Sequence, residues 1–204
     1  MDERLRRVAR ESIGFMPDDE GIALYQAGLE AGRIGPLLEI GTYCGKSSVY
    51  LGAAAREAGT LLFTIDHHRG SEEHQAGWEY RDERLVDAET GRYNTLPAFQ
   101  RTIELAGLED VVVGIVGDSS PVARYWGAGL GLLFIDGSHT DASATADYEG
   151  WTPYVLPGGL LAIHDVYLDP AAGGQAPHRI YRRALQERFV EVSSTGSLRI
   201  LRRR

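Results

Sequence analysis

Residues 37–48 read LLEIGTYCGKSS, and they decide the fold. The apolar run Leu37–Ile40 leads into a turn with glycines at 41 and 45, and a helical pattern follows over residues 46–58. This order is typical of a parallel α/β sheet, where glycine lets the backbone turn sharply and lets a ligand approach the main chain. An ordinary tight turn would look the same. The spacing matches neither the G-x-G-x-x-G of dinucleotide-binding turns nor the glycines of a P-loop.

The alternation of short apolar runs and helical patterns continues along the chain. We expect strands at 37–40, 61–65, 111–116, 132–135 and 160–163, each nearly continuous in apolar residues, as in strands buried on both faces. Helices are expected near 3–13, 19–31, 46–58, 95–105, 121–127, 142–154 and 177–187. Two further strands, 189–192 and 198–201, flank a Thr195-Gly196 hairpin signal, which makes the last strand antiparallel. The sequence therefore predicts a three-layer α/β sandwich with a seven-stranded, mostly parallel sheet.

Composition limits the classes of protein. With 204 residues, 43% of them apolar, we expect one domain, 1–204, with N-terminal helices in residues 1–35. No apolar run reaches the ~18 residues of a membrane span, and the charged start MDERLRRVAR does not resemble a secretory signal. The single cysteine, Cys44, fits a reducing, cytoplasmic setting, and the net charge of −8 argues against nucleic acid as a partner. Residues 157–159, Pro-Gly-Gly, predict a turn, and the arginines at 202–204 predict a solvated tail.

Acidic residues follow the second and third predicted strands. Ligands in such sheets lie beyond the carboxyl ends of the strands. Asp66 ends the second strand, where an acid can accept the two hydroxyls of a ribose. Asp118 ends the third strand, where it can accept from an exocyclic amine. Both residues would also suit a turn or a helix cap.

The fourth and fifth strands end in Asp136-Gly-Ser-His139 and His164-Asp165. Neighbouring strands bring these residues to one rim of the sheet. Two carboxylates with a histidine there predict a divalent-metal site. The alternative is a pair of helix caps with two exposed histidines.

These motifs carry a resemblance to a known family. The turn Glu39-Ile-Gly41-Thr-Tyr-Cys-Gly45-Lys-Ser47 resembles the first motif of class I S-adenosylmethionine-dependent O-methyltransferases, especially the metal-dependent, catechol O-methyltransferase-like branch. Asp136-Gly-Ser-His139, Leu156-Pro-Gly-Gly and His164-Asp165 are similar to a related branch that methylates sugars and secondary metabolites. The resemblance covers residues 36–165 and implies the Rossmann-like methyltransferase fold. Residues 67–73 also resemble mycobacterial-type enzymes that methylate the reducing-end hydroxyl of methylmannose polysaccharide precursors.

The resemblance implies roles for particular residues. The cofactor S-adenosylmethionine would be held at its methionine end by Glu39, Gly41, Thr42, Tyr43, Gly45, Ser47 and Ser48, at its ribose by Asp66, and at its adenine by Asp118 and Ser119, with Asp136 close by. Asp136, His164 and Asp165 would hold Mg²⁺ or Mn²⁺, and a nitrogen ligand at 164 shifts the preference from Mg²⁺ towards Mn²⁺, Co²⁺ or Zn²⁺. The alternative is that His164 faces away, which leaves a Mg²⁺ site of Asp136, Asp165 and waters. His139 stands where the catechol branch has a lysine base, and with Asp136 it would be catalytic.

The acceptor is predicted from the long segment 66–93, which exceeds a usual connection. It carries His67, His68, Trp78 and Tyr93, which suit a sugar through ring stacking and hydroxyl hydrogen bonds. We expect a lid-like insertion, with a solvated helical excursion as the alternative. The predicted acceptor is a sugar or oligosaccharide hydroxyl, and a catechol or phenol is the alternative.

Two other functional classes compete with this interpretation. A nicotinamide-dependent dehydrogenase needs the absent G-x-G-x-x-G turn and has no need of a metal rim. A non-catalytic binding module has no use for the residues Asp136, His139 and Asp165 together. We also expect a homodimer without a membrane or nucleic-acid partner.

Overall fold

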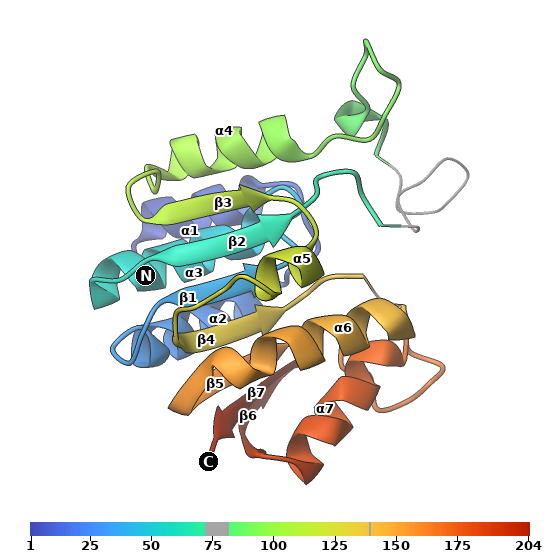
Figure 1. Cartoon of the computed structure of the whole chain (residues 1–204). Coiled ribbons are helices and arrows are strands. Elements are labelled where there is room, and N and C mark those ends of the chain that lie inside the picture. Colours follow the sequence, from blue (N-terminus) through green and yellow to red (C-terminus); the bar gives the residue numbers. More distant parts are fainter. Residues whose placement is uncertain (72–81, 139) are drawn as a thin grey trace.

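The computed structural model describes residues 1–71, 82–138 and 140–204, and its helices and strands alternate along the chain (Figure 1). The helices are α1 (Glu3–Glu11), α2 (Asp18–Ala31), α3 (Lys46–Ala58), α4 (Leu96–Ala106), α5 (Ser119–Ala123), α6 (Asp141–Trp151) and α7 (Ala176–Gln186), with 3-10 turns η2 (Glu83–Leu85) and η3 (Thr152–Tyr154). The strands are β1 (Leu37–Ile40), β2 (Leu62–Asp66), β3 (Val112–Val116), β4 (Leu130–Ile135), β5 (Val155–Ile163), β6 (Phe189–Thr195) and β7 (Leu198–Arg203).

Within the described residues the strands form one seven-stranded sheet in the order β3-β2-β1-β4-β5-β7-β6. The first five pair in parallel, and β7 is antiparallel to both β5 and β6. The predicted sheet and its antiparallel last strand are therefore confirmed. Strands β2 and β3 lie on one side of β1, and β4 and β5 lie on the other. The strand order therefore reverses between β1 and β4, which is where ligands bind in such sheets.

Two layers of helices cover the sheet (Figure 1). Helices α1 to α4 pack on one face against alternate strand residues such as Leu37, Leu132 and Leu160. Helices α5 to α7 pack on the other face against the residues between them, such as Leu38 and Leu133. The alternation follows from the two-residue period of a strand, and it produces the predicted three-layer sandwich. Within the described residues, every helix is too short or too polar to span a bilayer.

Two predictions about the strands were wrong. The predicted strand at 111–116 was expected to be buried on both faces, but β3 is an edge strand, and Val116 is 60% exposed. The Pro-Gly-Gly segment 157–159 was expected to be a turn, but it lies within β5. The register between β4 and β5 shifts between Leu130 and Leu132, so this segment forms a bulge, which is where a strand tolerates proline.

The arginines at the C-terminal end were expected to form a solvated tail, and this was also wrong for two of them. Arg202 and Arg203 belong to β7, and Arg202 forms an ion pair with Glu30 at 2.7 Å. The guanidinium of Arg203 donates to the carbonyls of Pro153 and Val155. These arginines therefore tie the sheet to η3 and α2.

Candidate functional site

The turn between β1 and α3 is built by three residues with positive φ. Gly41, Tyr43 and Gly45 have φ of 92°, 49° and 87°, so the chain reverses between strand and helix within a few residues. A Cβ on Gly41 would clash with the carbonyl of Asp136, because the turn packs directly against the end of β4. The amide of Tyr43 donates to Asp66 Oδ2 at 2.8 Å, which ties the turn to the end of β2.

A cavity of about 1040 Å³ opens at the carboxyl ends of the strands. This volume holds a drug-sized ligand with room beside it. The predicted site residues that line it are Gly41, Thr42, Tyr43, Ser47, Asp66, His67, Asp118, Ser119, Asp136, His164 and Asp165. The structure therefore brings together the ends of β1 to β5, as the sequence predicted for this edge.

Asp66 is held firmly in the cavity wall. Its Oδ2 accepts from the amide of Tyr43, and its Oδ1 accepts from the amide of His68 at 2.7 Å. A carboxylate has about four lone-pair positions, so both oxygens can accept further hydrogen bonds. Asp66 can therefore accept from two hydroxyls of a bound ligand.

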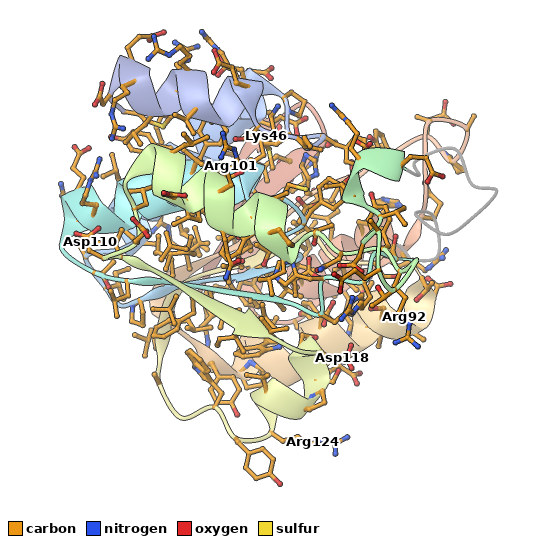
Figure 2. The ribbon with its side chains drawn as sticks, turned by 90° about the horizontal axis from the view of Figure 1, so that it is seen from above. Lys46, Arg92, Arg101, Asp110, Asp118 and Arg124 are labelled. Atoms are coloured by element: carbon orange, nitrogen blue, oxygen red, sulfur yellow. The ribbon has the colours of Figure 1, made fainter. Side chains whose placement is uncertain are left out.

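Asp118 and Ser119 lie at the junction of β3 and α5, and Asp118 is exposed there (Figure 2). The hydroxyl of Ser119 donates to Asp147 Oδ1, and Asp147 also lines the cavity although it is only 4% exposed. Burial raises the pKa of Asp147 to about 6, against the opposing effect of the Ser119 hydrogen bond. The sequence interpretation missed Asp147. One feature of the sequence could have indicated Asp147, because it is an acid among the residues of α6 that are buried, next to Tyr148.

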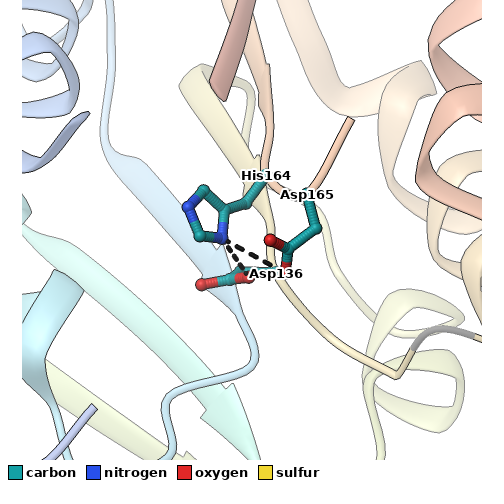
Figure 3. A group of neighbouring side chains, drawn as sticks. All are labelled: Asp136, His164 and Asp165. Carbon is teal, nitrogen blue, oxygen red and sulfur yellow. Dashed lines mark hydrogen bonds and ion pairs between the residues drawn. The ribbon is translucent and has the colours of Figure 1, made fainter. Parts of the chain in front are cut away.

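Asp136, His164 and Asp165 lie at the ends of β4 and β5, and their ligand atoms all lie within 4.8 Å of one another. His164 Nδ1 is 3.1 Å from Asp136 Oδ1 and 3.4 Å from Asp165 Oδ2 (Figure 3). The backbone of Asp165 has a φ of 55°, which is a strained value for a residue other than glycine. The Tyr167 hydroxyl donates to Asp165 Oδ1 and helps to hold the residue in this conformation. These three predicted residues do form one cluster.

Glu20 of α2 completes this cluster, and the sequence interpretation missed it. Its Oε2 lies 2.5 Å from His164 Nε2, and both side chains are 5% exposed. Burial alone would lower the pKa of His164, but the charges and hydrogen bonds of Asp136, Asp165 and Glu20 raise it. Burial alone would raise the pKa of Glu20, but His164 and Ser197 together lower it. No motif marks Glu20, because acids in a first helical turn are common.

Glu39 lies beneath the turn rather than in the cavity wall. It is fully buried, and Ser48 Oγ and Thr64 Oγ1 donate to its Oε2 at 2.5 and 2.6 Å. Its Oε1 has no hydrogen-bond partner among the described residues, and burial raises its pKa to about 7. Glu39 and Ser48 thus support the turn from below, and Gly45 also lies outside the wall.

Of the four residues predicted to contact the substrate, three are described, and they do not all line the cavity. The side chain of His67 is 44% exposed and lines the cavity. His68 and Tyr93 are buried outside its wall, where His68 Nδ1 lies 2.7 Å from Thr95 Oγ1 and the Tyr93 hydroxyl lies 3.0 Å from that of Tyr43. Trp78, the predicted base His139 and residues 72–81 of the predicted lid lie outside the described residues.

Comparisons with known proteins give a family from a family model and a fold from solved structures. Residues 38–166 match the model of a family described as "Methyltransferase domain". Three solved structures are similar over almost the whole chain. The O-methyltransferase from Bacillus cereus in complex with SAH has 20% sequence identity and a TM-score of 0.66, and the match covers 100% of this chain and 92% of that one. The O-methyltransferase TomG from Streptomyces achromogenes, involved in tomaymycin synthesis and in complex with SAM, has 18% identity and a TM-score of 0.66, with coverages of 100% and 90%. The O-methyltransferase NovP has 17% identity and a TM-score of 0.71, with coverages of 99% and 88%. At these identities the likeness shows a shared fold, the Rossmann-like methyltransferase fold.

The matched range contains most of the cavity wall. It includes the turn after β1, Asp66, Asp118 and the cluster of Asp136, His164 and Asp165. It also spans more than half of the chain. The chain therefore belongs to the methyltransferase domain family.

Proposed function

We propose that the protein transfers the methyl group of S-adenosylmethionine to a hydroxyl oxygen, assisted by a divalent metal ion. The observation that carries this proposal is one cavity whose wall contains the glycine turn, Asp66 and the cluster of Asp136, His164 and Asp165. The methyl group of a sulfonium is already activated. The protein has to align an oxygen with the sulfur–carbon bond and make that oxygen nucleophilic, and alignment alone supplies several kcal/mol.

Family membership supports the cofactor, and the arrangement of the wall suits it. Gly41, Thr42, Tyr43 and Ser47 would face the methionine end, and Asp118 and Ser119 would face the adenine. Asp66 would accept from the ribose hydroxyls, because two backbone amides already fix its orientation. Glu39, Gly45 and Ser48 would act by holding the turn, since they lie outside the wall.

The residues of the cluster fit a divalent metal. Two carboxylates and one imidazole nitrogen converge within 4.8 Å, which is a donor set that Mn²⁺, Co²⁺ and Zn²⁺ accept. Asp136, His164 and Asp165 would hold the ion. When bound there, such an ion supplies a Lewis acid that lowers the pKa of an acceptor hydroxyl and favours substrates with adjacent oxygens.

The proton of the acceptor hydroxyl needs a base. His139 follows Asp136 by three residues in the sequence, and we assign this role to it. An imidazole has an ordinary pKa of ~6.5, so it can accept a proton near neutrality without being desolvated first. The only lysine, Lys46, is turned to other partners: its amine donates to the carbonyls of Arg10 and Ser12, both at 3.4 Å.

The acceptor we favour is a sugar or oligosaccharide hydroxyl, with the reducing-end hydroxyl of a methylmannose oligosaccharide as the narrowest candidate. Adjacent hydroxyls of a sugar suit a metal-bearing wall, and His67, which lines the cavity, would hydrogen-bond to them. A catechol or phenol is the second candidate, because the two adjacent oxygens of a catechol would suit the same metal-bearing wall.

Calorimetry followed by an acceptor screen tests the proposal. The full chain is titrated with S-adenosylhomocysteine and, in parallel, with NAD, and we expect heat only from the former. Neutral sugars and catechols are then screened for methyl transfer with and without EDTA, with Mn²⁺ added back. Binding of NAD but not S-adenosylhomocysteine would overturn the methyltransferase proposal, and full turnover in EDTA would overturn the metal role alone.

A further inference from the structure

The N-terminal helix α2 contributes a buried side chain to the wall of the metal cluster. Glu20 lies 144 residues before His164 in the chain, yet its Oε2 reaches His164 Nε2 at 2.5 Å. Both groups are nearly inaccessible to solvent, at 4% and 5% exposure. Such a contact between distant segments at buried side chains is strongly orienting, because hydrogen bonds to charged groups strengthen in a low dielectric.

The carboxylate of Glu20 is itself fixed from the opposite side. The amide of Ser197 donates to Oε1 at 2.6 Å, and the hydroxyl of Ser197 lies 3.3 Å from Oε2. A Cβ on Gly196 would clash with this carboxylate, so the hairpin between β6 and β7 is packed closely against it. Glu20 therefore cannot swing away from His164 without breaking contacts to the hairpin.

The position of Glu20 decides which nitrogen of His164 faces the cluster. A carboxylate accepts hydrogen bonds, so Nε2 must carry a hydrogen toward Glu20. Nδ1 then points at Asp136 and Asp165, at 3.1 and 3.4 Å. Histidine ligands of metals commonly donate their other ring hydrogen to a carboxylate, which fixes the tautomer and raises the basicity of the ligating nitrogen.

We propose that Glu20 is a positioning residue that holds His164 with Nδ1 toward Asp136 and Asp165, and so makes this a mixed nitrogen and oxygen site selective for Mn²⁺, Co²⁺ or Zn²⁺ over Mg²⁺. The inference rests on the metal-assisted function proposed above. It also gives α2 a defined task, because this helix completes the pocket from outside the matched range 38–166.

Metal titration of the full chain, without S-adenosylmethionine or acceptor, tests this role. Mn²⁺ binding is measured by electron paramagnetic resonance, and Co²⁺ ligation by its visible absorption. Glu20→Gln keeps the size of the side chain. In Glu20 one carboxylate oxygen accepts from the amide of Ser197 and the other accepts from His164, and in glutamine one of these two oxygens becomes an amide nitrogen that cannot accept. We expect the substitution to weaken Mn²⁺ binding by about 10-fold or more, within the ~10–100-fold range for such outer partners.

The matched control is Glu30→Gln on the same helix, whose carboxylate pairs with Arg202 far from the cluster. We expect it to leave Mn²⁺ affinity and the Co²⁺ spectrum unchanged. The Co²⁺ spectrum of Glu20→Gln should move toward that of His164→Asn, which removes the imidazole. A merely structural role for Glu20 would lower thermal stability without moving that spectrum.

A double-variant comparison removes the remaining ambiguity. If Glu20 acts through His164, then Glu20→Gln in the His164→Asn background adds less than a twofold further loss of Mn²⁺ affinity. The proposal would be overturned if Glu20→Gln bound Mn²⁺ as tightly as the wild type does. It would also be overturned if the wild-type protein bound Mg²⁺ more tightly than Mn²⁺. No metal binding by the wild type would show instead that His164 is a buried cation paired with three carboxylates. Because S-adenosylhomocysteine binding is measured separately, none of these results is confused with failure of the methyltransferase proposal.

Discussion

At the scale of single residues, substitution of Asp136 is the sharpest test of the proposed reaction. Asp136→Ala removes one carboxylate of the cluster while the backbone contact of residue 136 to Ile40 at 2.9 Å is retained. We expect turnover to fall on the order of 100-fold or more, as for loss of a metal ligand, with S-adenosylhomocysteine affinity within a few-fold of wild type. Kinetics and calorimetry on the same preparation measure both.

The control for Asp136→Ala is Asp110→Ala. Asp110 is an exposed acid at the opposite end of β3 from Asp118 (Figure 2). The Asp110→Ala substitution should change neither turnover nor affinity for S-adenosylhomocysteine. An Asp136→Ala enzyme that keeps wild-type turnover would remove Asp136 from the mechanism.

Asp147 predicts a dependence of stability on pH. Its pKa is raised to about 6 by burial, so the folded state takes up a proton on this side chain that the unfolded chain, with its ordinary pKa near 3.8, does not. The folded state is therefore favoured below about pH 4, and this advantage is lost as pH rises through 6. One pKa unit corresponds to about 1.4 kcal/mol, so the ionised group destabilises the folded state by at most about 3 kcal/mol at pH 8.

Asp147→Asn should therefore be more stable than the wild type at pH 8, since an amide oxygen still accepts from Ser119. The advantage should shrink as the pH falls from 6 to 4. Urea unfolding of both proteins across this range measures the difference, and a difference that does not vary with pH would refute the assignment.

The residues at the strand ends were predictable from the sequence, but their supporting partners were not. Asp136 and Asp165 each follow a short apolar run, and parallel strands place such positions on one edge. Glu20 follows Asp18 and Asp19 in the first turn of α2, where acids ordinarily serve the helix dipole. Only the packing of α2 against α3 and the hairpin separates their roles: Asp18 pairs with Arg6 and Arg10, while Glu20 meets His164.

At the scale of elements, the arginines of β7 illustrate the same limit and yield a prediction. The guanidinium of Arg203 donates to two carbonyls beside η3, whereas the side chain of Arg204 is exposed at the end of the described chain. Arg203→Ala should lower the free energy of unfolding by about 1–3 kcal/mol, because two carbonyls lose a charged donor. Arg204→Ala should change it by less than about 0.5 kcal/mol. If urea unfolding showed that Arg203→Ala and Arg204→Ala change the free energy of unfolding equally, the interpretation of these arginines as a solvated tail would be restored.

Elements whose ends are set by local backbone chemistry were predicted well. Helix α3 spans the expected residues, because Gly45 and Gly59 stand at its two ends with φ of 87° and 73°. Strand β5 begins five residues before the expected start, because its bulge at 156–159 depends on pairing with β4 rather than on local sequence. The edge position of β3 is likewise a property of the sheet order, which no single apolar run reveals.

At the scale of the whole molecule, the negative charge is concentrated where the substrate would bind. The net charge is −8, and the described part of the cavity wall carries six acids: Glu20, Asp66, Asp118, Asp136, Asp147 and Asp165. Lys46 is the one lysine or arginine among those described lining residues. One divalent ion would offset only part of this charge. The sulfonium of the proposed cofactor is a cation, so the same field would favour its entry.

This field predicts which acceptors the enzyme rejects. A neutral sugar or catechol enters without electrostatic penalty, whereas a phosphorylated or sulfated analogue of the same acceptor meets a wall of like charge. We expect kcat/KM for the anionic analogue to be lower by about 10-fold or more at low ionic strength. The gap should narrow as salt is raised toward 0.5 M, because the Debye length then falls to well under the ~10 Å of 0.1 M salt. Paired assays at several salt concentrations measure this. An anionic analogue that is preferred at low salt would show that arginines outside the described wall, rather than its carboxylates, govern acceptor binding.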